Sequence, residues 1–201
     1  MTYKDLLTRI KMDDKDILNV YQYGSRVYGT DRQGSDWDFV IIVSRKERDE
    51  YSDNLVNVFF YTPLEFDKKL KDHEITAIEC FFLPEHLIWK EKLKFSFEVK
   101  KSSLRSSLSA KADNSFVKAH KKLSIEKDYD LVVGKKSLFH SFRIITYGIQ
   151  LAEAGKITNY QACNELFYEI THNYNTWSEL FKAYKNKYNN LKSEFRILAP
   201  K

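Results

Sequence analysis

The stretch from Asp36 to Val43, "DWDFVIIV", constrains the fold of this chain more than any other segment. Its last five residues are apolar without interruption and rich in β-branched side chains, which is typical of a strand buried on both faces. Two carboxylates, Asp36 and Asp38, stand at its start. Residues two apart in a strand share a face at a spacing of about 6.6 Å. Anions held that close repel each other unless a cation lies between them or one takes a proton.

A hard divalent cation would relieve this repulsion, because Mg²⁺ is typically held by one or two carboxylates together with substrate phosphates. A D-x-D pair alone is a weak signal, since Asp36 could be a turn residue and Asp38 an exposed strand start. A second signal lies twelve residues earlier, where Gly24-Ser25 directly follows the predicted strand Ile17–Tyr23. Glycine permits a turn whose backbone N–H groups converge on an anion. The two signals together predict a phosphate cradle beside a metal site.

The segment "GSRVYGT…GSDWDFVI" resembles the G-S…D-x-D signature of nucleotidyltransferases of the DNA polymerase β superfamily. Within that superfamily it is similar to the predicted bacterial and phage nucleotidyltransferases with the motif G-S-R-x-Y-G-T…S-D-x-D. The resemblance implies an α+β fold, with an N-terminal mixed β-sheet and flanking helices followed by a C-terminal helical unit. It also implies a catalytic, metal-binding pair and a set of nucleotide-binding residues in this segment. The pair is Asp36 and Asp38, and the set is Gly24, Ser25, Arg26 and Ser35.

The implied activity is transfer of a nucleoside monophosphate from an NTP, with ATP as the expected donor, to an acceptor hydroxyl. Mg²⁺ is the expected cofactor and Mn²⁺ the alternative. The sequence does not identify the acceptor, and RNA, DNA and a protein partner all stay open.

The family usually supplies a third carboxylate, which helps to deprotonate the attacking hydroxyl. Its best match here is Asn57, whose amide cannot act as a base at neutral pH. Asp53 could substitute for it if its strand starts earlier or bends. Glu65 and Glu79 are weaker candidates, since both fall in predicted helices. The alternative function is therefore a non-catalytic nucleotide-binding module or sensor with a degenerate site.

Hydrophobic spacing predicts the remaining elements of the N-terminal part. A helix is expected over Tyr3–Ile10, where apolar residues recur at helical spacing, and a third strand over Leu55–Thr62. Thr62-Pro63-Leu64-Glu65 has the form of a capping box, so a helix should begin there. Helical spacing prevails from about Leu104 onward. We therefore expect a nucleotidyltransferase domain over residues 1–95 and a helical domain over 96–201 that closes the nucleotide cleft.

A helix is expected between Lys135 and Gly155, with Gly155 as its stop. Its apolar stripe is formed by Leu138, Phe142, Ile145, Ile149 and Ala152. The opposite stripe is formed by Lys136, His140, Arg143 and Tyr147, and its cations and imidazole would suit a nucleotide. Solvent exposure of a surface helix explains the same stripe. Resemblance to the helical half of the family adds Lys136, His140 and Arg143 to the nucleotide-binding set, while Lys135 points sideways.

Two further helices are expected after Gly155. Thr158 with Gln161 repeats the capping-box form and would open a helix that runs to about Thr171. The last helix is expected over Trp177–Phe195.

The net charge of +5 is unevenly distributed along the chain. Residues 1–89 carry a net charge of −5, whereas residues 90–136 carry +7. The basic segment suits an anionic partner such as a triphosphate or a nucleic acid, and equally a solvated lysine-rich surface.

No apolar run approaches the roughly 20 residues of a membrane helix, and the charged N-terminus does not resemble a signal peptide. A cytoplasmic location is expected, without a membrane partner. Cys80 and Cys163 have neither the spacing of a zinc site nor that of a disulfide framework, so both are expected to be core thiols.

Overall fold

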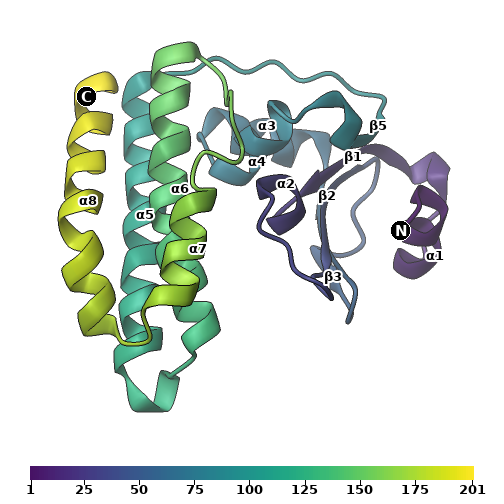
Figure 1. Cartoon of the computed structure of the whole chain (residues 1–201). Coiled ribbons are helices and arrows are strands. Elements are labelled where there is room, and N and C mark those ends of the chain that lie inside the picture. Colours follow the sequence, from purple (N-terminus) through teal and green to yellow (C-terminus); the bar gives the residue numbers. More distant parts are fainter. The chain divides into compact units, whose positions relative to one another are not determined.

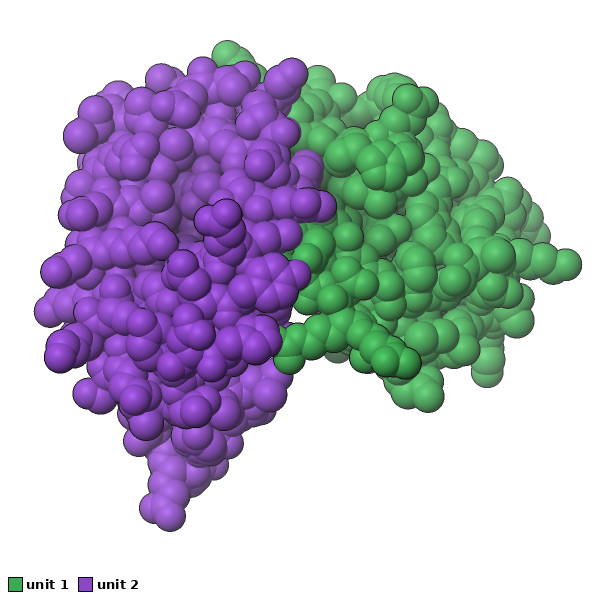
Figure 2. All heavy atoms as spheres, in the orientation of Figure 1, with its two compact units in different colours: residues 1–98 green, residues 99–201 purple.

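The computed structural model describes all 201 residues of the chain, which divide into two compact units, residues 1–98 and 99–201 (Figure 2). The sequence places this boundary three residues earlier. The first unit is built around a sheet and the second is entirely helical, so the predicted α+β fold class is confirmed.

A mixed five-stranded sheet forms the centre of the first unit, in the order β3-β4-β2-β1-β5. Strand β1 pairs antiparallel with β2 and β5, β2 pairs parallel with β4, and β3 pairs antiparallel with β4. The strands are β1 (Ile17–Tyr23), β2 (Trp37–Val43), β3 (Glu50–Ser52), β4 (Val56–Tyr61) and β5 (Ile88–Glu91). The three strands expected from the sequence are present with bounds that agree within one residue. The short edge strands β3 and β5 were not expected.

Helices cover both faces of the sheet (Figure 1). Helix α1 (Tyr3–Ile10) buries Leu6 and Ile10 against one face, in a core formed with Val20, Phe39, Ile41, Val58 and Phe60. The opposite face receives α3 (Pro63–Lys71), whose Phe66 ring stacks on Tyr21 with centroids 5.7 Å apart. Helix α4 (Ile75–Phe81) packs beside α3 and β1. The capping box predicted at Thr62 and Glu65 is confirmed.

Short helical turns complete both units. Helix α2 (Ser25–Tyr28) follows β1 directly. Single 3₁₀ turns lie at η1 (Asp14–Asp16), η2 (Glu85–Leu87) and η3 (Glu126–Asp128).

The second unit is a bundle of long helices arranged around α6 (Leu131–Ala154). Its other members are α5 (Lys101–Ser124), α7 (Asn164–Asn173) and α8 (Trp177–Leu198), all of which pack against α6 (Figure 1). The five predicted apolar residues of α6 are buried. A Cβ atom on Gly148 would lie 2.8 Å from the Phe195 ring, which shows how closely α8 approaches α6. The helix ends at Gly155 with φ of 69°, as predicted.

The predicted capping box at Thr158 and Gln161 is wrong, since α7 begins only at Asn164. The backbone N–H of Thr158 donates to Oε1 of Gln150 over 2.8 Å, and the Thr158 hydroxyl donates to the same oxygen over 3.0 Å. The threonine therefore binds a side chain of α6 instead of capping a helix of its own. The last helix begins at Trp177 as expected and extends to Leu198.

Both cysteines are buried free thiols, as expected. Among all the helices, none combines the length and the apolar character that crossing a membrane requires.

Candidate active site at the start of strand β2

The two aspartates of the D-x-D pair meet at the side chain of Asn57. Asp38 lies opposite Asn57 in the parallel pairing of β2 with β4, so their side chains share one face of the sheet. Nδ2 of Asn57 donates to Oδ2 of Asp36 over 2.5 Å and to Oδ1 of Asp38 over 3.2 Å. The structure therefore brings both carboxylates to a single point, at the position where the sequence matched the family's third acid.

Gly24 is required beside this pair for a steric reason. Its φ is +83°, a conformation that favours glycine, and a Cβ atom built on it would lie 2.1 Å from Oδ2 of Asp38. The absent side chain is therefore what lets Asp38 pack against the turn between β1 and α2. The first N–H groups of a helix have no partner within it, so this turn presents backbone donors beside the aspartates.

Ser25 and Ser35 belong to the two loops next to the pair. Ser25 is the first residue of α2 and directly follows the Gly24 turn. The Ser35 hydroxyl accepts from the backbone N–H of Arg32 over 2.8 Å, which closes the turn before β2.

Arg26 donates its hydrogen bonds to the loop that precedes β2. Its Nη2 donates to the Ser35 carbonyl over 2.5 Å, and its Nε donates to the Asp36 carbonyl over 3.2 Å. A salt bridge of 3.3 Å to Asp31 and a position 4.3 Å from the centre of the Trp37 ring complete its contacts. The guanidinium therefore holds the backbone that carries Asp36. A direct contact of Arg26 with nucleotide stays a prediction.

Asp53, considered as a substitute third acid, is committed elsewhere. Its Oδ1 accepts from the backbone N–H groups of Leu55 and Val56 over 2.8 Å each. Its Oδ2 accepts from Arg9 over 3.0 Å and from the Tyr51 hydroxyl over 2.9 Å. These hydrogen bonds, that from Leu55 first, lower the pKa of Asp53 to about 2. Asp53 shapes the turn between β3 and β4 and does not join the D-x-D pair.

The other two acids are also engaged. Glu65 caps α3 and pairs with Lys46, and Glu79 accepts from the Tyr28 hydroxyl over 2.6 Å. Nowhere in the chain do three or more His, Cys, Asp or Glu side chains gather so that they could hold a metal ion. Asp36 and Asp38 fit a hard divalent cation in ligand type and convergence, and they would hold it as a pair.

A hollow of about 370 Å³ opens beside Asp38. Its lining contains two carboxylates, three aromatic rings and no lysine or arginine; the residues are Tyr23, Asp38, Glu50, Tyr51, Ser52, Asn57, Val58 and Phe59. Burial first, and then the negative charge of Asp38, raise the pKa of Tyr23. The phenol therefore stays protonated at neutral pH. The hollow offers an acidic, aromatic surface next to the paired aspartates.

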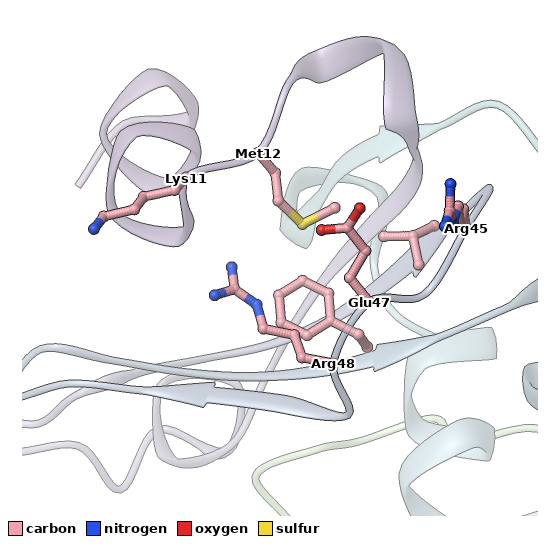
Figure 3. A pocket seen from close by; sticks show the side chains of 7 residues that line it. Lys11, Met12, Arg45, Glu47 and Arg48 are labelled. Carbon is pink, nitrogen blue, oxygen red and sulfur yellow. The ribbon is translucent and has the colours of Figure 1, made fainter.

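A second hollow, of about 220 Å³, lies at the opposite end of β2, beside Val43 (Figure 3). Arg48 lines it but donates to the Ile10 carbonyl and lies 5.1 Å from the centre of the Phe60 ring. None of the residues that the sequence assigns to the site lines this hollow.

The polar stripe of α6 is largely drawn into the bundle, so its explanation as a solvent-facing stripe is wrong for most of it, while its part in nucleotide binding stays a prediction. Nε of Arg143 donates to Nδ1 of His140 over 3.3 Å, and its guanidinium lies 5.1 Å from the Tyr147 ring centre. The Tyr147 hydroxyl donates to the Tyr160 carbonyl over 2.6 Å. A helix packed against three others has too little free surface to leave a whole stripe unpartnered. Lys136 is exposed.

Burial first, and then the positive charge of Arg143, lower the pKa of His140 to about 3. The imidazole is therefore neutral at physiological pH and accepts a hydrogen bond at Nδ1. The sequence suggested a titratable group at this position.

Lys135 is buried and structural. Its Nζ donates to the Thr171 carbonyl of α7 over 3.0 Å and to Oδ1 of Asn175, beyond the end of that helix, over 3.1 Å. The sequence placed Lys135 sideways of the stripe, and its side chain is engaged within the helical unit.

Sequence reasoning missed Ser52. It lies opposite Asn57 in the antiparallel pairing of β3 with β4, and its hydroxyl donates to Oδ1 of Asn57 over 2.6 Å. The turn residues "SDN" before β4 were the available signal, since they indicate a hairpin that would bring a short strand beside Asn57.

The fold and the paired aspartates agree with one class of protein, and comparison with protein families shows it. Residues 4–108, more than half of the chain, match the family described as "Nucleotidyltransferase domain". The chain belongs to this family and is an enzyme of the nucleotidyltransferase class, so the superfamily predicted from the sequence is confirmed. Enzymes of this family generally use a divalent metal ion.

The solved structures include a crystal structure of spectinomycin adenyltransferase AAD(9) from Enterococcus faecialis with ATP and spectinomycin. It aligns with a TM-score of 0.47 and 12% sequence identity, over 98% of this chain and 100% of that chain. Among curated proteins, no relative matches the chain.

Proposed function

We propose that this nucleotidyltransferase moves a nucleoside monophosphate from Mg²⁺–ATP to an acceptor hydroxyl at the start of β2. The convergence of Asp36 and Asp38 on one point beside the Gly24 turn carries the proposal. Two carboxylates and a turn of backbone donors are complementary to a metal ion and to phosphate oxygens, respectively.

The residues of the chain mainly position the reactants. Asp36 and Asp38 would hold Mg²⁺, or Mn²⁺ in its place, and the bound ion would neutralise phosphate charge as pyrophosphate leaves. Gly24 and Ser25 would bind phosphate oxygens through backbone N–H groups and the Ser25 hydroxyl, while Ser35 and Arg26 fix the loop that carries Asp36. The acceptor oxygen forms a bond to the α-phosphorus, and the bond from this phosphorus to the pyrophosphate oxygen breaks. The hydroxyl proton leaves to a carboxylate or to water, because Asn57 cannot take it.

The helical unit would contribute to nucleotide binding through side chains of α6. Lys136, which is exposed, offers an ammonium group to phosphates. His140 offers a neutral N–H, and Arg143 orients it by donating to Nδ1.

The hollow beside Asp38 is the place we assign to the acceptor. Its two carboxylates, Asp38 and Glu50, and its lack of cations favour a neutral or cationic group with an apolar face over a polyanion. The basic segment 90–136 suggests the opposite kind of acceptor, a polyanionic nucleic acid. Its binding would weaken steeply with added salt, with a log–log slope of about −0.9 per phosphate contact on a duplex.

The test is calorimetry with each NTP, with Mg²⁺ and with a chelator, combined with a pyrophosphate-release assay. ATP should bind only with the metal, and replacement of both Asp36 and Asp38 by Asn should abolish this binding while the fold stays intact. Equal affinity for ATP with chelator, or an unchanged double variant, would show that the D-x-D pair is not the metal site.

A nucleotide sensor without turnover is the second candidate, and the amide at position 57 favours it. A site without a third carboxylate has lost a contribution to proton removal that is typically worth ~10²–10⁴-fold. Tight Mg²⁺–ATP binding without pyrophosphate release, over a range of acceptors including polyols, amines, RNA and protein, would identify a sensor.

A further inference from the structure

We propose that the side-chain amide of Asn57 competes with the metal ion for Asp36 and Asp38, and that Ser52 strengthens this competition. The inference rests on the proposed function in one respect, namely that the D-x-D pair binds the metal. It assigns to Ser52 and Asn57 a positioning role that sets how readily the site is loaded.

Asp38, Asn57 and Ser52 lie opposite one another on the neighbouring strands β2, β4 and β3 and form a row across the sheet. Asp38 pairs with Asn57, and Asn57 pairs with Ser52, so all three side chains lie on one face. The Ser52 hydroxyl donates to Oδ1 of Asn57 over 2.6 Å. Nδ2 of the same amide donates to Asp36 and Asp38 over 2.5 and 3.2 Å. Both ends of the amide are therefore in use.

The neighbours of the amide select this orientation. An amide turned by half a rotation would direct the lone pairs of Oδ1 at two carboxylates, which are acceptors only. The Ser52 hydroxyl, which can donate or accept, adapts to whichever amide atom faces it. The carboxylates therefore draw the N–H end toward themselves, and the hydroxyl completes the network from the other side.

In this orientation the amide and a metal ion would take the same place. Nδ2 lies where the two carboxylate oxygens converge, and an amide nitrogen has no lone pair to offer a cation. Loading the site therefore requires the N–H end to leave, either by a swing of the side chain or by a half rotation that presents Oδ1. Hydrogen bonds to charged groups are stronger than neutral ones, so their loss opposes metal binding.

The experiment measures divalent-metal affinity without nucleotide in the full chain. Mn²⁺ is the probe, because the spectroscopic signal of the free ion reports its binding, and Mg²⁺ affinity follows by competition. Asn57→Ala removes the competing donors and should tighten Mn²⁺ binding about tenfold, the equivalent of one hydrogen bond to a charged group. Ser52→Ala should shift the affinity in the same direction by about two- to threefold, since a single neutral hydrogen bond is worth less.

Asn54→Ala is the matched control, because Asn54 is an exposed asparagine of the same hairpin, whereas the amide that binds the pair is that of Asn57. Its Mn²⁺ affinity should equal that of the parent. Thermal unfolding of each variant with and without Mg²⁺ gives a readout that is independent of turnover. Asn57→Ala should be stabilised more by Mg²⁺ than the parent.

The outcomes separate this inference from the proposed function. If the variant with Asn at both positions 36 and 38 binds Mn²⁺ as the parent does, the metal site itself is wrong. If that variant loses binding but Asn57→Ala binds Mn²⁺ more weakly or equally, Asn57 is a ligand or a bystander, and the competition is overturned while the function stands. If Asn57→Ala binds more tightly and Ser52→Ala is unchanged, the part assigned to Ser52 is wrong.

Discussion

Two regions of this enzyme carry polar side chains that the sequence assigns to nucleotide binding, and these side chains are engaged differently in the two regions. At the start of β2, Asp36 and Asp38 stay together at one point, where both accept hydrogen bonds from the amide of Asn57. On α6, Arg143 and His140 bind each other, and the imidazole is kept neutral. Only Lys136 of that predicted stripe is exposed.

The difference follows from the number of neighbours that each element has. A strand end at the edge of a core has one face open, and the period of two puts both aspartates on it. A helix at the centre of a bundle meets α5, α7 and α8, so a polar stripe finds protein partners. Paired charges at a strand end are therefore a stronger sign of a ligand site than a polar stripe on a helix.

The largest expected effect comes from restoring a third carboxylate, which tests whether a general base is all that the site at the start of β2 lacks. Asn57→Asp supplies a third carboxylate opposite Asp38, and we expect pyrophosphate release to rise by ~10²–10⁴-fold, the typical contribution of a general base. Without Mg²⁺ the variant should unfold at a lower temperature than the parent, because three carboxylates repel. Asn54→Asp adds the same charge at an exposed position of the same hairpin and should change neither quantity. An unchanged rate for Asn57→Asp would mean that proton removal does not limit this enzyme.

The next effect concerns the turn that makes room for Asp38. Gly24→Ala places a methyl group where Oδ2 of Asp38 lies, and the displaced carboxylate should lower transfer by about 10²-fold, as misplacement by 1 Å can. Gly34→Ala is the matched control, since Gly34 also has a left-handed φ, +86°, but nothing lies within 4 Å of its added Cβ. It should cost about 1 kcal/mol of stability through backbone strain and leave transfer within a few-fold of the parent. Equal losses of transfer in both variants would attribute the effect to strain and not to Asp38.

The strand site could be predicted largely from local sequence. The continuous apolar run predicted β2, and the resemblance to the family matched Asn57, in the expected strand after it, to the third acid of the site. Ser52 escaped prediction because β3 has only three residues, too few for a pattern of alternation to show. Its place is set by the hairpin that Asp53 stabilises, which is a property of the turn and of β4.

In the helical unit, prediction failed where the decisive partner belongs to another element. Thr158 and Gln161 have the spacing of a capping box, but Gln150 on α6 supplies the acceptor that Thr158 uses. Likewise, nothing near His140 in the sequence indicates that burial would hold its pKa at about 3. Both outcomes depend on how other parts of the chain pack against α6, and periodicity alone does not specify this.

A smaller effect is expected from replacing the adjacent lysines of α6, one of which is exposed and the other buried. Lys136→Ala removes an exposed cation and should weaken ATP binding by about 1 kcal/mol, roughly fivefold in Kd, while stability is unchanged. Lys135→Ala should leave ATP affinity unchanged and cost ~1–3 kcal/mol of stability, because it removes the buried donor to Thr171 and Asn175. Calorimetry and urea unfolding of both variants measure the two quantities. A loss of ATP affinity in Lys135→Ala alone would invert the assignment.

The smallest effect is a pH dependence that arises from His140. Its pKa in the folded chain, about 3, lies below the ordinary value of about 6.5, so the unfolded chain takes up the proton first. The contribution to stability is therefore complete above about pH 6.5 and is lost as the pH falls toward 3, with a slope of at most about 1.4 kcal/mol per pH unit. Urea unfolding at pH 7, 6 and 5 should show a smaller loss in His140→Asn, whose amide oxygen still accepts from Arg143. A neutral imidazole also predicts that His140 adds nothing to ATP affinity as the pH falls from 7 to 5.5. A gain in affinity over that range in the parent, absent from His140→Asn, would show that the imidazole binds phosphate as a cation, which would remove the contrast between helix and strand.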